Sequence, residues 1–277
     1  MSARLREIAQ STRRIVEAGG YPTGDGRTVV LADAVARARA GTRMYGPDPV
    51  ETPPAPIGAA GSVEVTGESS LEAARRLTGE RPDPVAVLNF ASARNPGGGF
   101  LNGAQAQEEA VCRSSALYAC LIEAPEFYAH HRADRDVFYT DRVIHAPGVP
   151  VFRDDRGALL DTPYEVGFLT SPAPNAGVIA QRTPERVPEI PGVLASRAER
   201  VLEVAAAHGY RRLVLGAWGC GVFRNDPAQV AEAFRALLAG RFSGYFDHVV
   251  FAVLDRTKDA ATRQAFVRVL GAGQLQP

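Results

Sequence analysis

The stretch PVAVLNFASARNPGGGF, residues 84–100, indicates the fold class of this chain. Its first half is a short apolar run, as is typical of a strand that is buried on both faces of a sheet. Its second half is a loop that contains three consecutive glycines, Gly97, Gly98 and Gly99. A buried strand that runs directly into such a loop is typical of α/β proteins, whose ligands bind beyond the carboxyl ends of the strands.

The rest of the chain alternates strand and helix patterns on both sides of this stretch. Ser69 and Glu72 form a capping box, which predicts the start of a helix that continues to about residue 77. Further strands are predicted at residues 28–31, 63–66, 137–145, 164–171, 212–215 and 248–254. Further helices are predicted at residues 3–18, 106–125, 196–208, 227–238 and 259–270. This alternation predicts an α/β/α sandwich with a largely parallel central sheet.

The prolines and glycines between these patterns suggest how the chain is organised. Residues 46–61 and 171–191 contain five prolines each, so we expect a connector and a loop there. We predict that residues 61–277 form one domain and that residues 1–60 are a helical extension packed on it.

Composition and charge exclude several classes of protein. The 277 residues include 45% hydrophobic and 22% charged side chains, which are ordinary globular values. The 31 basic and 31 acidic residues give a net charge of zero, which argues against a broad electrostatic grip on nucleic acid. No apolar run is long enough to span a membrane. The wide spacing of Cys112, Cys120 and Cys220 fits neither a disulfide framework nor a zinc site, and we expect a reducing cytoplasm.

A second glycine-rich loop, GAWGCGVF at residues 216–223, follows the strand predicted at residues 212–215. Glycines allow backbone amides to approach phosphate oxygens, and a helix N-terminus adds partial positive charge. Neither loop matches GxGxxG or GxxxxGK[ST], and each one alone could be an ordinary turn between a strand and a helix. Together they favour a diphosphate ligand.

The residues that follow the first loop point to a family. Gln107, Glu108 and Glu109 begin a predicted helix, where acidic residues are also favoured by the helix dipole. Three glycines, seven residues and then QEE resemble the signature of the poly(ADP-ribose) glycohydrolases. The runs at residues 87–100 and 216–223 resemble the bacterial-type members, and the resemblance covers about residues 63–255. It implies a macrodomain that binds ADP-ribose, with the first loop near the distal ribose and the second around the diphosphate.

The resemblance also implies how the two glutamates divide the chemistry. Hydrolysis of the ribose–ribose O-glycosidic bond needs an acid for the leaving oxygen and a base for water. Consecutive helical residues point about 100° apart, so two adjacent carboxylates cannot face each other across the bond. By the family pattern Glu109 is the acid and base, while Glu108 accepts hydrogen bonds from ribose hydroxyls. We expect the charge of Glu108 and the bound diphosphate to raise the pKa of Glu109.

The resemblance assigns further residues to the substrate. The predicted substrate-binding residues are Asn95, Gly97, Gly98, Gly99, Gln107, Gly219, Cys220, Gly221, Val222 and Phe223. Asn95 could instead only form the turn, and Phe223 could belong to the core rather than pack on the distal ribose. Cys220 has no obvious histidine partner and is interpreted as a small residue, not as a nucleophile.

The implied activity is the release of ADP-ribose from the ends of poly(ADP-ribose), without a metal or other cofactor. The expected partners are poly(ADP-ribose), ADP-ribose and poly-ADP-ribosylated proteins, with no membrane and no sequence-specific nucleic-acid binding. Three alternatives stay open: a macrodomain that binds ADP-ribose without cleavage, a hydrolase of an ADP-ribose ester and, more remotely, a phosphate-binding transferase. His130 and His131 are expected to be solvated in a charged loop, and Trp218 is expected to serve packing.

Overall fold

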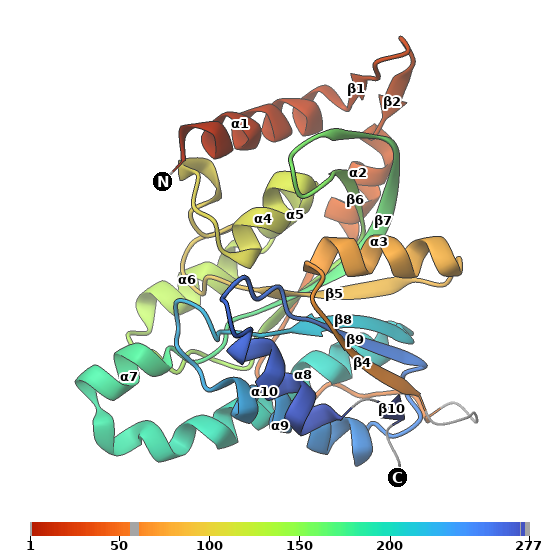
Figure 1. The fold of residues 1–277 in the computed structure, drawn as a ribbon. Helices are drawn as coiled ribbons and strands as arrows, with labels where there is room; N and C mark the ends of the chain where they lie inside the picture. The colour runs from red at the N-terminus through yellow and green to blue at the C-terminus, as the bar shows by residue number, and fades with distance from the viewer. Residues whose placement is uncertain (1, 56–60, 272, 275–277) are drawn as a thin grey trace.

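The computed structural model describes residues 2–55, 61–271 and 273–274. In these residues an eight-stranded sheet forms the centre of the molecule (Figure 1). The strand order is β10-β4-β9-β8-β5-β7-β6-β3. The strands are β3 (Arg43–Tyr45), β4 (Ser62–Thr66), β5 (Val85–Phe90), β6 (Val143–Arg153), β7 (Leu159–Ser171), β8 (Arg212–Gly216), β9 (His248–Ala252) and β10 (Gly273–Gln274). From β4 to β7 neighbouring strands are parallel, whereas β10, β6 and β3 join antiparallel. The predicted α/β sandwich with a largely parallel sheet is confirmed.

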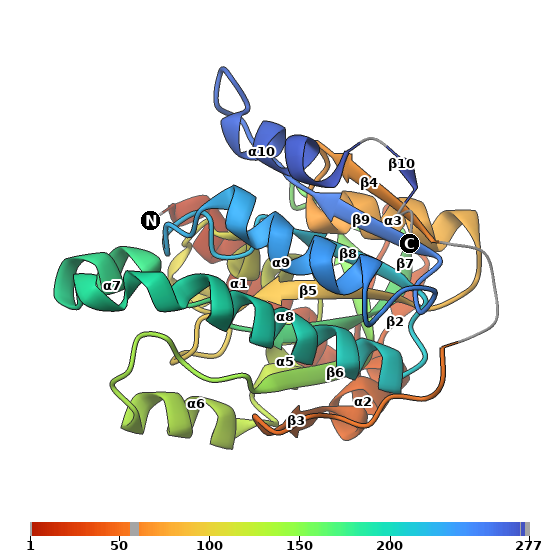
Figure 2. The same ribbon diagram turned by 90° about the horizontal axis from the view of Figure 1, so that it is seen from below.

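Helices cover both faces of the sheet. They are α1 (Ala3–Ala18), α2 (Ala32–Gly41), α3 (Ser70–Glu80), α4 (Gln107–Ser114), α5 (Leu117–Leu121), α6 (Pro125–Ala133), α7 (Ala176–Arg182), α8 (Ile190–Ala207), α9 (Pro227–Ala239) and α10 (Ala261–Leu270), with short 3₁₀ turns η1 (Phe100–Asn102) and η2 (Pro184–Glu189). Figures 1 and 2 show α8, α9 and α10 on one face and α3, α4 and α5 on the other. Two buried apolar clusters, one on each face, form the core. None of the described helices is long and apolar enough to cross a membrane.

The central strand β5 positions the first glycine-rich loop. Val85, Ala86, Val87 and Leu88 are fully buried, because β5 is covered on both faces and lies between β7 and β8. The three strands run in parallel, so their carboxyl ends meet at one edge of the sheet. Both glycine-rich loops therefore emerge at the same edge, where ligands of open α/β sheets bind.

The N-terminal segment contributes to the sheet as well as packing on it. Strand β3 pairs antiparallel with β6, and β1 (Gly20–Pro22) and β2 (Thr28–Val30) form a separate ribbon. Helix α1 contacts α4 through Thr12, whose hydroxyl donates to the carbonyl oxygen of Arg113 at 2.6 Å. The boundary at residue 60 stays a prediction, and residues 56–60 of the predicted connector lie outside the described residues.

The region after the first loop differs from the prediction of one helix over residues 106–125. The helix breaks at Ser115, whose extended backbone (φ −141°) forms an isolated bridge with Val151 of β6. Pro125 does not end the helix but is the first residue of α6. A backbone N–H at this position has no partner within the helix, so a proline costs no hydrogen bond there. Periodicity alone could not reveal this break, because the apolar residues on both sides of Ser115 face the same core.

Two predicted loops are helical, and one predicted strand lies too early in the chain. Residues 171–191 contain α7 and η2, because Pro184 and Pro191 lie in the first turns of helical segments. His130 and His131 lie on α6, and His131 is buried with 1% of its surface exposed. The prediction that they are solvated in a loop is therefore wrong for His131. Strand β6 extends over Val143–Arg153 rather than over residues 137–145.

Candidate active site

Two acidic side chains from α4 converge on the first glycine-rich loop. Glu108 and Glu109 lie in the first turn of α4 and expose only 2% and 8% of their surfaces. A Cβ atom added to Gly98 would lie 2.5 Å from Oε1 of Glu109 and 3.1 Å from Oε2 of Glu108. Gly98 also has a φ of +56°, which side chains rarely adopt. Only a glycine allows the loop to lie this close to both carboxyl groups.

The carboxyl group of Glu108 is held by the end of β5 and by the loop. Oε2 accepts a hydrogen bond from the backbone N–H of Ser92 at 2.7 Å, and Oε1 accepts one from Nδ2 of Asn89 at 3.2 Å. Asn89 is fully buried and also donates to Oγ1 of Thr170 on β7. Burial raises the pKa of Glu108 to about 8, despite these hydrogen bonds, which lower it.

This pKa changes the expected electrostatics of the pair. We expected the negative charge of Glu108 to raise the pKa of Glu109. Burial disfavours the charged form of Glu108 more than its two hydrogen bonds stabilise that form, so the pKa of Glu108 itself is raised. The effect of the Glu108 charge on the pKa of Glu109 stays a prediction.

The raised pKa of Glu108 predicts a dependence of stability on pH. In the unfolded chain the carboxyl has its ordinary pKa of 4.5, so between about pH 4.5 and 8 the folded state binds more protons than the unfolded state. The contribution of Glu108 to stability is therefore largest below pH 4.5 and is lost as the pH rises toward 8. The melting temperature of the natural chain should fall from pH 5 to pH 8 relative to that of Glu108→Gln, which stays neutral. If the melting temperatures of the two proteins change with pH by the same amount, the pKa of Glu108 is not raised in the folded protein.

Glu109 has one oxygen fixed and one without a partner. Oε1 accepts a hydrogen bond from the backbone N–H of Gly99 at 2.8 Å. Oε2 is buried and has no hydrogen-bond partner among the described residues. Buried polar atoms without a partner are uncommon in folded proteins, and a catalytic role is one of the explanations for them. Oε2 is therefore the oxygen that is available to hold and transfer a proton.

Gln107 locks the start of α4 against β5. Its Nε2 donates to Oγ of Ser70 at 3.1 Å and to the carbonyl oxygen of Leu88 at 2.9 Å, and its Oε1 accepts from the N–H of Phe90 at 2.9 Å. These three contacts fix the orientation of the two glutamates that follow. They make Gln107 a positioning residue, and a direct contact of its amide with substrate stays a prediction.

The second loop contains both packed and exposed residues. A Cβ atom on Gly219, where φ is +70°, would lie 2.4 Å from Cβ of Ala173 and 2.5 Å from Nδ2 of Asn225. By contrast, Gly221 and Val222 face outward: a Cβ atom on Gly221 would meet nothing within 4 Å, and Val222 is 80% exposed. Gly219 therefore shapes the loop, whereas Gly221 and Val222 are open to solvent, and their contact with a ligand stays a prediction.

Neither Cys220 nor Trp218 has the properties of a reactive residue. Burial raises the pKa of the Cys220 thiol to about 12, so the thiol stays neutral near pH 7, as its interpretation as a small residue requires. Trp218 is 1% exposed and donates from Nε1 to the carbonyl oxygen of Ser171, which confirms its role in packing.

Tyr139 connects the two loops, and sequence reasoning did not find it. Its ring centroid lies 6.0 Å from that of Phe223 in the second loop and 6.0 Å from Cζ of Arg94 in the first. Its φ of +60° is unusual for a residue with a side chain. Phe223 is half-buried and Asn95 is exposed at the rim of the first loop. No motif or spacing marks Tyr139, because its importance arises only from the way β6 enters the sheet.

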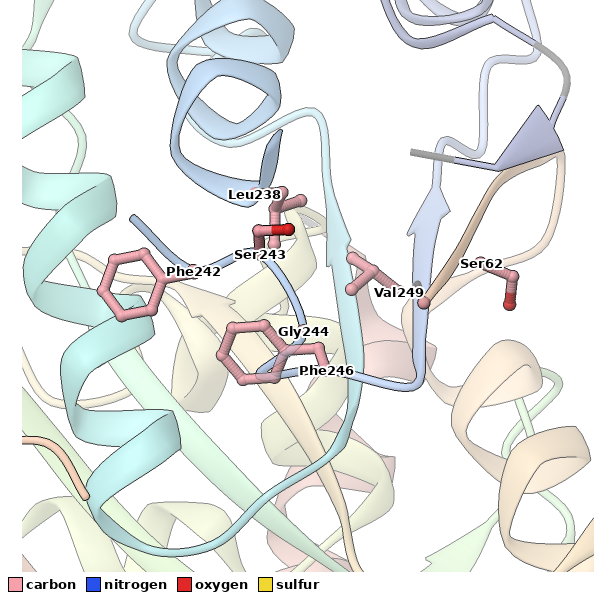
Figure 3. A pocket seen from close by; sticks show the side chains of 8 residues that line it. Ser62, Leu238, Phe242, Ser243, Gly244, Phe246 and Val249 are labelled. Carbon is pink, nitrogen blue, oxygen red and sulfur yellow. The ribbon is translucent and has the colours of Figure 1, made fainter. Parts of the chain in front are cut away.

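A small cavity and the distribution of metal-binding side chains among the described residues do not suggest another active site. A cavity of about 10 Å³ has room for about one water molecule. Its lining includes Ser62, Phe242 and Val249 (Figure 3), and it lies where β4 and β9 begin, at the edge opposite the glycine-rich loops. Within residues 2–55, 61–271 and 273–274, no group of three or more His, Cys, Asp or Glu side chains could hold a metal ion.

Comparisons with known proteins agree with this geometry. The family model described as microbial-type PARG, catalytic domain, matches residues 9–154. The crystal structure of poly(ADP-ribose) glycohydrolase from Thermomonospora curvata has 54% sequence identity and a TM-score of 0.91, with 97% of this chain and 100% of that chain covered. The same enzyme bound to the inhibitor ADP-HPD has 53% identity and a TM-score of 0.88, with 96% and 99% covered.

A third match comes from a different bacterium. Poly(ADP-ribose) glycohydrolase from Deinococcus radiodurans in complex with ADP-ribose has 47% identity and a TM-score of 0.79, with 88% of this chain and 99% of that chain covered. Among curated protein sequences none matches significantly. The similarity to the solved structures extends over nearly the whole chain, including the N-terminal segment that the sequence resemblance did not cover.

Proposed function

The chain belongs to the microbial-type poly(ADP-ribose) glycohydrolase family, whose members are glycosidases, and we propose that Glu109 is the general acid and base of this reaction. The observation that supports this role is the buried Oε2 of Glu109, which has no partner among the described residues. A protein that only binds ADP-ribose has no need for two buried carboxyl groups at the same glycine.

The proposed mechanism uses one carboxyl group twice. Protonated Glu109 donates its proton from Oε2 to the glycosidic oxygen, which leaves as the 2′-hydroxyl of the next adenosine. The bond between that oxygen and C1″ of the distal ribose breaks through an oxocarbenium-like transition state. Water then forms a new bond to C1″ and gives its proton to Glu109, which restores the acid. One water is consumed and one ADP-ribose is released in each cycle.

Small movements accompany this proton transfer. Because Oε2 of Glu109 is buried in the free structure, the carboxyl must rotate or the Gly98 loop must shift to bring Oε2 to the substrate. Glu108 stays fixed by Ser92 and Asn89, and each of its oxygens keeps a second lone pair for a ribose hydroxyl. We propose that Asn95, the glycines of both loops and Phe223 hold the distal ribose and the diphosphate.

We further propose that the enzyme acts on chain ends. The test is incubation with poly(ADP-ribose) of defined length, followed by chromatography of the products at early times. Action at chain ends should release ADP-ribose from the first minutes while the remaining polymer shortens gradually. Early accumulation of oligomers of intermediate length, before free ADP-ribose, would show that internal bonds are cleaved instead.

The partners and compartment follow from the same proposal. The natural substrates are proposed to be proteins that carry poly(ADP-ribose). We place the enzyme in the cytoplasm, since Cys112, Cys120 and Cys220 are all free thiols, as a reducing compartment favours.

A further inference from the structure

An open cavity of about 360 Å³ lies beside the candidate active site. Its lining includes Tyr139, Asp141, Gly192 and Arg197, from the segment that enters β6 and from the N-terminal part of α8. Small-molecule sites of proteins typically have volumes of roughly 300–1,000 Å³, so this cavity can hold a nucleoside. Nothing in the proposed mechanism uses it.

The strand order places this cavity on one defined side of the reacting bond. Along the ligand-binding edge the strands follow the order β8-β5-β7-β6. The loop after β8 is proposed to hold the diphosphate, and the loop after β5 the distal ribose. The next positions along the edge are the end of β7 and the start of β6, where the cavity lies. At about 4.8 Å between neighbouring strands, the start of β6 is about 10 Å from the end of β5.

The cavity wall contains groups that suit an adenosine. Tyr139 offers an aromatic ring that also contacts Phe223, so the wall is continuous with the proposed ribose site. Arg197 is only 1% exposed, yet it lines the cavity, and its Nε forms an ion pair with Asp141 at 3.1 Å. Its Nη1 donates to the carbonyl oxygen of Pro172 at 2.8 Å, whereas Nη2 has no hydrogen-bond acceptor among the described residues.

We propose that this cavity binds the adenosine of the penultimate ADP-ribose unit, the part of the polymer that leaves when the terminal unit is cut off. The inference rests on the proposed placement of the distal ribose at the β5 loop. The leaving oxygen belongs to the ribose of that adenosine, so this nucleoside must lie next to the scissile bond. Its adenine stacks on Tyr139, and the polar atoms of Arg197 and Asp141 face its ribose and base.

Gly192 provides the test, because it lines the cavity without belonging to the catalytic machinery. It is exposed on α8, and an added Cβ atom would meet nothing within 4 Å. Gly192→Trp therefore fills the cavity without disturbing the core. Gly79→Trp is the matched control: Gly79 is also an exposed helical glycine with open space around it, near the end of α3 at the opposite edge of the sheet.

Each protein is assayed on poly(ADP-ribose) and on ADP-ribose that carries p-nitrophenol at C1″, which has the terminal unit but no penultimate one. Gly192→Trp should raise KM for the polymer at least about fivefold, the size of a lost base–aromatic stack, and leave KM for the p-nitrophenyl glycoside unchanged. Gly79→Trp should change neither value. Melting temperatures establish that both variants are folded.

Two outcomes would overturn the proposal: an unchanged KM for the polymer, or an equal rise in KM for both substrates. The ratio of the two KM values does not depend on which group transfers the proton. Failure of this proposal is therefore distinguishable from failure of the role assigned to Glu109.

Discussion

Glu109→Gln should lower kcat on poly(ADP-ribose) by about 10²–10⁴-fold, the range typical of a lost general acid and base. The amide is nearly isosteric with the carboxyl, and its oxygen can still accept the hydrogen bond that the N–H of Gly99 donates to Oε1. It cannot, however, donate a proton to the leaving oxygen and take one back from water. Both bond cleavage and the attack of water are therefore slowed, while the binding site keeps its shape.

The measurement is the initial rate of ADP-ribose release, with ADP-ribose affinity determined by calorimetry as the check on binding. We expect an affinity within a fewfold of that of the natural chain. Glu17→Gln is the control, because Glu17 is an exposed residue of α1 that forms an ion pair with Arg13, far from the two glycine-rich loops in sequence. A Glu109→Gln enzyme with near-normal turnover would exclude Glu109 as the proton donor and direct attention to Glu108, whose pKa of about 8 also allows it to carry a proton.

Local patterns predicted the part of the fold that positions the site. The apolar run of β5, the capping box at Ser69 and the glycines after β5 each specify structure through neighbouring residues, and all three occur as predicted. The edge of the sheet could not be predicted in this way. Strand β3 has only three residues, and it is a strand because it pairs with β6, about a hundred residues away in sequence.

The same distinction applies to the site. The signature indicated Glu108 and Glu109, but the pKa of Glu108 depends on the burial that Asn89, Thr170 and the Gly98 loop create together. Sequence spacing contains no information on desolvation, so the raised pKa of Glu108 could not be predicted from it. Tyr139 was missed for a related reason, since its neighbours Phe223 and Arg94 come from distant parts of the chain.

Phe223→Ala should lower kcat by about 10²-fold while the affinity for ADP-ribose falls much less. The ring of Phe223 is proposed to hold the distal ribose beside Glu109, and a displacement of about 1 Å at a reacting centre can lower the rate by ~10²-fold even when the ligand still binds. Most of the binding contacts, to the diphosphate and the adenosine, are unaffected by the substitution. The loop itself is retained, because the carbonyl oxygen of Phe223 still accepts a hydrogen bond from the N–H of Gly177 at 2.9 Å.

The alternative, in which Phe223 serves only the core, makes the opposite prediction. Removal of a fully buried phenylalanine destabilises a protein by ~3–5 kcal/mol, and Phe234→Ala on α9 should show this loss because Phe234 is 0% exposed. Phe223 is half-buried at the rim, so its removal leaves an open surface rather than a closed void. The melting temperature of Phe223→Ala should therefore stay close to that of Val222→Ala, in which the side chain that is removed is 80% exposed. If Phe223→Ala instead melts as early as Phe234→Ala and its folded fraction turns over normally, the ring belongs to the core and the ribose must be held by other residues.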